Sequence, residues 1–298
     1  MEYRTQEEEN GKKLKEILRG PMKISYSALK STKWNGEIRL NGKIAHTNTR
    51  VQAGDLISVV FPEANPAYQL KPYDLPLKIV YEDRDLRIVD KPAGLASQSS
   101  RNHPDDSLEN ALYAWDGCPE SFIYRPVNRL DKGTGGLMVI ARNAYSQHLL
   151  QQMLHTDRFR RFYLARTDGH PPEEKGKICL PIGKAPGMTL KRMICPEGKP
   201  SVTYYRVIAE DEEHSLILLE LGTGRTHQIR VHLSAIGCPI QGDFLYGRED
   251  PAAFPACFAL HSAGLMLTHP VTGETIRRIS LPEWSPETDP SVLFMDFH

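Results

Sequence analysis

A lone carboxylate, Asp131, stands at the head of a glycine-rich turn in this 298-residue chain. Residues 125–141 read Arg-Pro-Val-Asn-Arg-Leu-Asp-Lys-Gly-Thr-Gly-Gly-Leu-Met-Val-Ile-Ala. The three glycines allow a close approach of backbone to a ligand, and the apolar run after them is typical of a buried strand. A carboxylate held where the chain meets a cleft can act as a nucleophile or a general base. An aspartate that only closes a turn would give the same local pattern.

A second segment, about a hundred residues later, is dense in hydrogen-bond donors. Residues 221–232 read Leu-Gly-Thr-Gly-Arg-Thr-His-Gln-Ile-Arg-Val-His, with Arg225, His227, Gln228 and Arg230 within six positions. Arginine stays charged and binds carboxylate or phosphate through a planar fork. The segment could therefore supply a partner for Asp131 or a clamp for a phosphodiester.

The two segments together resemble the RluA family of pseudouridine synthases. The signature of that family is His-Arg-Leu-Asp-x-x-Thr-Ser-Gly, and residues 128–136 here read Asn-Arg-Leu-Asp-Lys-Gly-Thr-Gly-Gly. Further elements follow in the family's order: a Lys-Pro-x-Gly turn at 91–94, Arg-Phe-Tyr-Leu-Ala at 161–165 and Thr-Gly-Arg-Thr-His-Gln-Ile-Arg at 223–230. Gly-Asp at 242–243, Tyr-Gly at 246–247, Leu-His at 260–261 and His-Pro at 269–270 complete the series.

The resemblance implies a catalytic site made of Asp131, Tyr163 and Arg230. Asp131 matches the catalytic aspartate, Tyr163 the tyrosine that packs against the base, and Arg230 the basic residue that orients the aspartate. A neighbouring arginine favours the ionised form of a carboxylate, and an aromatic face can stack on an extruded base. Arg129 matches the arginine that fills the space left by that nucleotide. By the same resemblance we expect further RNA-binding residues at Lys91, Asn128, Thr134, Arg161, Arg225, His227 and Gln228.

Three positions depart from the family pattern. Asn128 replaces His, Gly135 replaces Ser and Arg161 replaces Lys. Asparagine can donate a hydrogen bond but does not titrate near neutral pH, so a role that needs a proton from residue 128 is not available. None of the three removes the aspartate, the tyrosine or the second arginine.

Short strand-like runs predict the framework that positions these residues. They lie at 79–80, 87–89, 137–141, 163–166, 203–208 and 215–221, with helical patterns at 145–154 and 228–236. We expect an α+β catalytic domain at 77–298, with a mixed, mostly antiparallel sheet, flanking helices and a central cleft.

A small basic α/β module is expected at residues 1–61. Residues 11–50 hold ten Lys and Arg against two Glu, although the formal net charge of the whole chain is zero. Local clustering of this kind attracts a polyanion. Helical patterns at 14–18 and 26–34, then strand patterns at 38–42 and 51–60, resemble the S-four-type RNA-binding module. A basic, solvated cap on the enzyme is the alternative. Four prolines in residues 62–76 predict an extended linker.

Composition narrows the class of protein further. No apolar stretch approaches the roughly 18 residues of a membrane span, and the acidic start lacks a signal-peptide core. Five scattered cysteines without a C-x-x-C pair indicate reduced thiols in a cytoplasm and no structural zinc. No H-E-x-x-H or P-loop motif occurs.

The sequence therefore predicts a cytoplasmic pseudouridine synthase, a monomer that uses no metal or cofactor and acts on structured RNA. Large-subunit ribosomal RNA is the favoured substrate, and transfer RNA is the alternative. Two other functions stay open at this point. One is a non-catalytic RNA-binding or ribosome-assembly factor on the same fold. The other is a hydrolase that uses Asp131 with His227.

Overall fold

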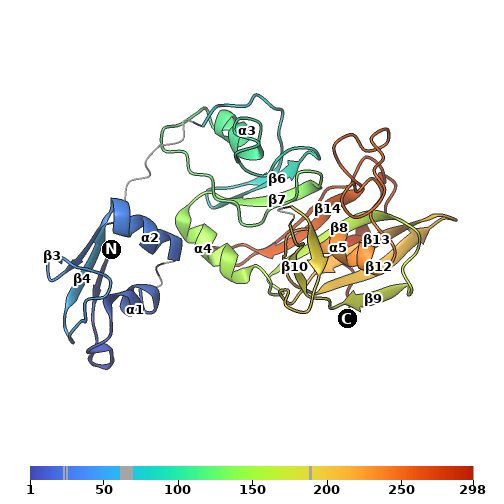
Figure 1. Ribbon diagram of the computed structural model, residues 1–298. Helices are drawn as coiled ribbons and strands as arrows, with labels where there is room; N and C mark the ends of the chain where they lie inside the picture. The colour runs from blue at the N-terminus through green and yellow to red at the C-terminus, as the bar shows by residue number, and fades with distance from the viewer. Residues whose placement is uncertain (23, 25, 61–69, 188–189, 298) are drawn as a thin grey trace. The chain divides into compact units, whose positions relative to one another are not determined.

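The computed structural model describes the whole chain except residues 23, 25, 61–69, 188–189 and 298 (Figure 1). It divides into two compact units, Met1–Gln69 and Leu70–His298. The predicted boundaries, with a linker at 62–76, fall partly on residues outside the described ones. Residues 70–77 are described and contain no helix or strand.

The first unit is a small antiparallel sheet with two helices. Its elements are β1 (Glu2–Arg4), η1 (Glu7–Glu9), α1 (Leu14–Arg19), α2 (Tyr26–Asn35), β2 (Glu37–Leu40), β3 (Lys43–Ile44) and β4 (Leu56–Val60), in the strand order β1-β4-β2-β3. Leu14, Ile17 and Leu18 recur at helical spacing and are buried in its core. Asn41 and Gly42, with φ of 50° and 79°, close the two-residue β2–β3 hairpin. The two predicted helices and the strand at 38–42 are confirmed, whereas the strand predicted at 51–60 is limited to β4, Leu56–Val60.

The second unit contains a nine-stranded sheet and a separate two-stranded one. Its strands are β5 (Lys78–Glu82), β6 (Leu86–Lys91), β7 (Gly135–Ala141), β8 (Phe159–Asp168), β9 (Lys175–Ile178), β10 (Ile182–Lys184), β11 (Arg192–Ile194), β12 (Thr203–Glu210), β13 (His214–Leu221), β14 (Leu260–Thr268) and β15 (Thr275–Ile279). Its helices are α3 (Leu108–Trp115), α4 (Ala144–Met153), α5 (Gln228–Ala235) and the short η2 (Pro290–Phe294).

Strand β14 joins the two halves of the large sheet. The strand order is β5-β6-β7-β14-β8-β13-β12-β9, and β15 also pairs with β14. Only the β7–β14 pair is parallel; the other pairs are antiparallel. In Figure 1, β7, β14 and β8 lie beside one another in the middle of the unit. The predicted mixed, mostly antiparallel α+β fold is confirmed.

Strand alternation divides the apolar residues between two faces of this sheet. On β7, Met138 and Ile140 join the core formed with α3 and α5, while Leu137 and Val139 pack with Leu150 of α4. On β8, Tyr163 and Ala165 face the α3 and α5 side, and Phe162 and Leu164 join a small cluster on the other. The face covered by α3 and α5 therefore carries Tyr163.

The sequence did not predict several elements of the second unit: α3, β9, β10, β11, β14, β15 and η2. Strand β14 reads Leu-His-Ser-Ala-Gly-Leu-Met-Leu-Thr, which mixes small and apolar residues without clear alternation. It is buried on both faces, so no polar face marks its period. Among the described residues, no helix is both long and apolar enough to cross a membrane.

Candidate active site

The turn before β7 places Asp131 at the edge of a pocket in the second unit. The Thr134 N–H donates to the Asp131 carbonyl at 3.1 Å and closes the turn. Gly136 has φ of 102° and packs so closely on Ser262 of β14 that a Cβ would clash with its backbone. A glycine is required there, and it fixes where the turn that follows Asp131 meets β14.

Arg230 on α5 links Asp131 to a second, buried carboxylate. Its Nη1 donates to Asp131 Oδ2 at 3.3 Å, and its Nε and Nη2 donate to the two oxygens of Asp243 at 2.6 and 2.8 Å. Asp243 is fully buried and Arg230 is 3% exposed. Burial alone would lower the pKa of Arg230, but Asp243 and Asp131 outweigh it and raise that pKa. The guanidinium is thus a permanent, oriented cation beside Asp131.

His227 approaches Asp131 from the N-terminus of α5. It adopts a left-handed conformation, with φ of 58°, and its Nε2 lies 3.8 Å from Asp131 Oδ2. Burial lowers the pKa of His227, so the imidazole is neutral at neutral pH. Its Nδ1 lies 2.8 Å from the Tyr246 hydroxyl, which also accepts the Arg192 N–H. The Tyr246 hydroxyl is then free to donate its own proton to His227 Nδ1. With that hydrogen bond, the neutral imidazole carries its proton on Nε2, the atom that faces Asp131.

Tyr163 forms part of the pocket's apolar wall. It is 4% exposed and lines the pocket with Leu221, Ile229 and Leu260. Burial raises the pKa of its phenol, so the hydroxyl stays protonated at neutral pH. The pocket thus combines a carboxylate, a fixed cation, a neutral imidazole and a protonated phenol.

Eight of the eleven residues singled out from the sequence line this one pocket. They are Arg129, Asp131, Thr134, Tyr163, Arg225, His227, Gln228 and Arg230. Arg129 and Arg225 are the exposed cations of this pocket lining. Gln228 is buried and accepts from Thr223 Oγ1 and the Arg225 N–H, which fixes the loop before α5.

The other three, Lys91, Asn128 and Arg161, are buried just outside the pocket lining. The Lys91 ammonium donates to the carbonyls of Pro92, Leu95 and Lys132 at 2.9, 2.8 and 3.4 Å. The Lys91 side chain therefore links the turn at 91–95 to Lys132, the residue after Asp131. Burial lowers the pKa of Lys91 to about 7, against the opposing effect of Asp131.

Asn128 and Arg161 also contact protein atoms. Asn128 Oδ1 accepts the Val139 N–H of β7 at 2.9 Å, and Arg161 Nη2 lies 3.2 Å from His155 Nδ1. Asn128 Nδ2 and Arg161 Nε have no hydrogen-bond partner among the described residues. In the described structure, Asn128 fastens the segment before Asp131 to β7.

Three residues of the site had no role in the sequence interpretation: Asp243, Tyr246 and Phe258. Phe258 lies under Arg230, with the guanidinium carbon 4.3 Å from the ring centroid. Asp243 and Tyr246 belong to the Gly-Asp and Tyr-Gly pairs that the resemblance matched. A sequence signal for Asp243 exists, because a buried arginine needs a carboxylate partner.

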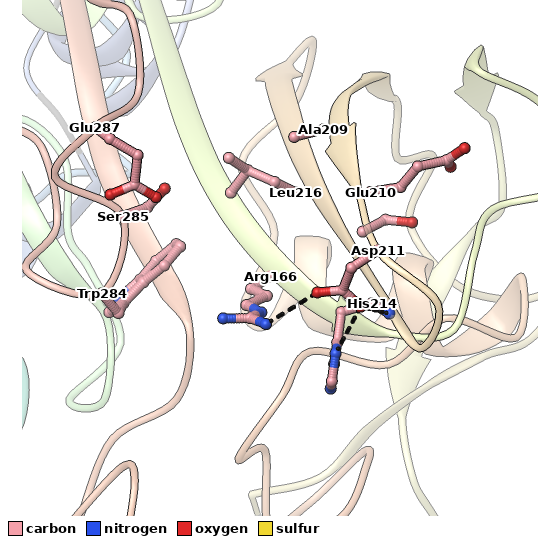
Figure 2. Close-up of a pocket in the computed structure, with 10 residues that line it drawn as sticks. Arg166, Ala209, Glu210, Asp211, His214, Leu216, Trp284, Ser285 and Glu287 are labelled. Atoms are coloured by element: carbon pink, nitrogen blue, oxygen red, sulfur yellow. Dashed lines mark hydrogen bonds and ion pairs between the residues drawn. The ribbon is translucent and has the colours of Figure 1, made fainter.

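A separate pocket contains none of these residues (Figure 2). Arg166 lies three residues after Tyr163 on β8, so its side chain is on the opposite face of the sheet. Asp211 pairs with both Arg166 and His214, at 3.2 and 3.1 Å. Arg166, Asp211 and His214 of this pocket are thus paired with one another, and the pocket lacks the group of side chains that surrounds Asp131.

Comparison with known proteins gives one consistent result. The sequence profile of a family described as RNA pseudouridylate synthase matches residues 85–235. An uncharacterized RNA pseudouridine synthase of Synechocystis is 38% identical over 259 residues, which cover 83% of this chain and 78% of that protein. Ribosomal large subunit pseudouridine synthase D of Escherichia coli is 34% identical over 286 residues, covering 90% and 86%.

A solved structure agrees. The human protein RNA Pseudouridylate Synthase Domain Containing 1 superposes with a TM-score of 0.59 at 28% sequence identity. The match covers 72% of this chain and 86% of the human chain.

Proposed function

The chain belongs to the RNA pseudouridylate synthase family and is an RNA pseudouridine synthase, and we propose that it isomerises uridine in large-subunit ribosomal RNA from the pocket around Asp131. The observation that carries the assignment of the site is the contact between Asp131 and Arg230, itself held by buried Asp243. This grouping supplies a carboxylate whose direction is fixed before RNA binds.

We assign the chemistry to Asp131. In the reaction the bond between the ribose and nitrogen 1 of uracil breaks, the uracil turns within the pocket, and carbon 5 bonds to the ribose. Carbon 5 then loses its proton to solvent and nitrogen 1 takes up a proton, so that the product is an isomer of uridine. The carboxylate acts on the target uridine, and Arg230 keeps it oriented.

Tyr163 and the apolar wall hold the freed uracil in this proposal. A base inside a stack cannot be reached, so the uridine must first be extruded. The buried Tyr163 ring offers a face for stacking, and Leu260 and Ile229 limit how far the base can move. Arg129, two residues before Asp131, is exposed and is available to occupy the space that the extruded uridine leaves in the RNA.

The first unit is proposed to bind RNA as an S-four-type module. Lys15, Arg19, Lys30 and the 68% exposed Tyr26 surround one hollow on α1 and α2. The Arg19 guanidinium lies 5.7 Å from the Tyr26 ring centroid. Cations interleaved with an exposed aromatic ring suit a phosphate backbone with unstacked bases.

Ribosomal RNA is the favoured substrate because two kinds of observation point the same way. Relatives in Escherichia coli and Vibrio vulnificus, 34% and 36% identical, are named ribosomal large subunit pseudouridine synthase D. The basic surface on the first unit suits a large, structured RNA. Such a substrate and the five free thiols agree with a cytoplasmic location.

The test is tritium release from carbon 5 of labelled uridine. RNA from a strain that lacks this gene is separated into large-subunit, small-subunit and transfer RNA, and each is incubated with the wild type or with Asp131→Ala. We expect release from large-subunit RNA by the wild type only. Release only from transfer RNA would replace the proposed substrate, and equal release by Asp131→Ala would remove Asp131 from the chemistry.

A further inference from the structure

The turn between Gly242 and Gly247 carries an exposed aromatic side chain beside the active site. Phe244 is 58% exposed, while Asp243 next to it is fully buried. A phenylalanine this exposed contributes little to the core, and single exposed apolar residues usually need no explanation. The position of this one sets it apart, because the Arg230 guanidinium carbon lies 5.8 Å from its ring centroid.

The backbone next to Phe244 is fixed by Asp243, the same residue that binds Arg230. Asp243 Oδ1 accepts the N–H groups of Leu245 and Tyr246 at 3.0 and 3.3 Å. The same carboxylate binds Arg230 through two hydrogen bonds. Phe244 is therefore fixed at its backbone, although its ring faces solvent. A ring presented in this way loses little conformational entropy when it meets a ligand.

The second side of the turn is anchored as well. The Tyr246 hydroxyl is 2.8 Å from His227 Nδ1, and His227 Nε2 faces Asp131. Both ends of the turn thus connect through one side chain to a group that contacts the catalytic carboxylate. The ring of Phe244 is not part of the pocket lining, but it lies beside Arg230, which is.

We infer that Phe244 is an RNA-binding residue, a stacking platform for an unpaired nucleobase next to the target uridine. The inference rests on the proposed function, because it takes the ligand at Asp131 to be RNA. When the uridine is extruded, its neighbours lose a stacking partner, and a rigid aromatic face at the rim replaces it. The exposed Arg129 and Arg225 at the same pocket supply charge for the flanking phosphates.

The experiment compares Phe244→Ala, Phe244→Leu and Phe244→Tyr. The dissociation constant for large-subunit ribosomal RNA, prepared from a strain lacking this gene, is measured with each substitution on an Asp131→Ala background, so that no uridine is converted. We expect dissociation constants about tenfold higher for the Ala and Leu variants and within about twofold for the Tyr variant. Tyr145→Ala on α4, which removes a 65% exposed ring outside the pocket lining, is the matched control and should leave binding unchanged.

Turnover by the same variants, with Asp131 intact, separates binding from chemistry. We expect Phe244→Ala to raise KM for tritium release and to leave kcat within about twofold, because stacking outside the pocket affects uniform binding. Thermal unfolding should match the wild type. Binding by Phe244→Ala equal to the wild type, or recovered by Phe244→Leu, would overturn the stacking role.

The two proposals fail in different ways. Tritium release by the wild type, with equal dissociation constants across the Phe244 series, would leave the synthase proposal intact and remove only Phe244. Absence of release from every RNA fraction would count against the proposed substrate and site, whereas the binding series would still decide whether Phe244 stacks on RNA.

Discussion

The pocket around Asp131 and the basic hollow of the first unit both concentrate charge, but they hold it differently. In the pocket, Arg230 is 3% exposed and has two carboxylate partners. In the hollow, Lys15, Arg19 and Lys30 belong to exposed helix faces around Tyr26. The first arrangement holds one buried cation between two carboxylates, and the second presents several exposed cations.

The buried cation of the pocket can orient a reacting group, whereas the exposed cations of the hollow can attract a polyanion. A buried ion pair costs desolvation and is not evidence of stability by itself, but it holds a reacting group in one direction. Exposed lysines and arginines contribute a field that depends on ionic strength and tolerates rearrangement. We therefore expect substitutions in the pocket to change turnover and stability, and substitutions in the hollow to change affinity and its salt dependence.

Asp243→Asn should have the largest effect. It leaves the buried charge of Arg230 without its main partner, and breaking such a pair typically costs about 3–5 kcal/mol. We expect a lower free energy of unfolding in urea and a fall in turnover of at least about a hundredfold, since Asp131 loses an oriented neighbour. The double variant Asp243→Asn, Arg230→Gln is the control. It should recover stability without recovering turnover, and equal recovery of both would contradict an orienting role.

A change of pH should affect stability through the buried His261. Burial lowers the pKa of His261 from 6.5 to about 4, and its Nε2 lies 3.2 Å from Ser280 Oγ. The unfolded chain binds the proton more readily, so stability is complete above pH 6.5 and is lost as the pH falls from 6.5 to about 4. This loss amounts to at most about 3 kcal/mol.

The measurement is urea unfolding between pH 4 and pH 7.5. His261→Gln removes the titrating group and should flatten part of the dependence, and His148→Gln, on an exposed part of α4, should leave it unchanged. His227, His232 and His155 also have a pKa lowered by burial, so some dependence should persist. An unchanged slope in His261→Gln would show that this imidazole binds its proton equally well in the native and the unfolded state.

Asn128→Leu tests the hydrogen bond that holds the segment before Asp131 against β7. It removes the acceptor of the Val139 N–H and leaves that group buried, at a cost of about 1–3 kcal/mol. Asn128→His, which restores the residue of the family pattern, offers a ring nitrogen as acceptor and should lose less. Chemical denaturation measures both. A larger loss of unfolding free energy in Asn128→His than in Asn128→Leu would mean that the space at residue 128 accommodates an amide but not an imidazole.

Charge reversal in the basic hollow should have the smallest effect on the chemical step. Lys15→Glu with Arg19→Glu should weaken RNA binding and reduce the slope of log affinity against log salt by about two, one for each lost phosphate contact. Turnover at saturating RNA should stay within about twofold. Lys175→Glu with Lys177→Glu, on β9 in the second unit, is a matched control of charge. An unchanged salt slope would contradict RNA binding by the first unit.

Much of this molecule could be predicted from local pattern. The Leu14, Ile17, Leu18 spacing predicted α1, and the run at 137–141 predicted β7. These features depend on neighbours within a few positions, where backbone preference and side-chain period decide the structure. Strand β14 was not predicted, because a strand that is buried on both faces does not alternate between polar and apolar residues.

The sequence by itself determined which residues could do chemistry, because the motif residues are fixed by type and spacing. Only the tertiary structure decided how they act together. Asp131 and Arg230 are 99 positions apart, and they meet because β14 holds β7 beside β8 while α5 packs over the same face. The partnership of Arg230 with Asp243, the orientation of His227 and the exposure of Phe244 beside them follow from that packing. Contacts between distant segments depend on the whole fold, which local pattern does not encode.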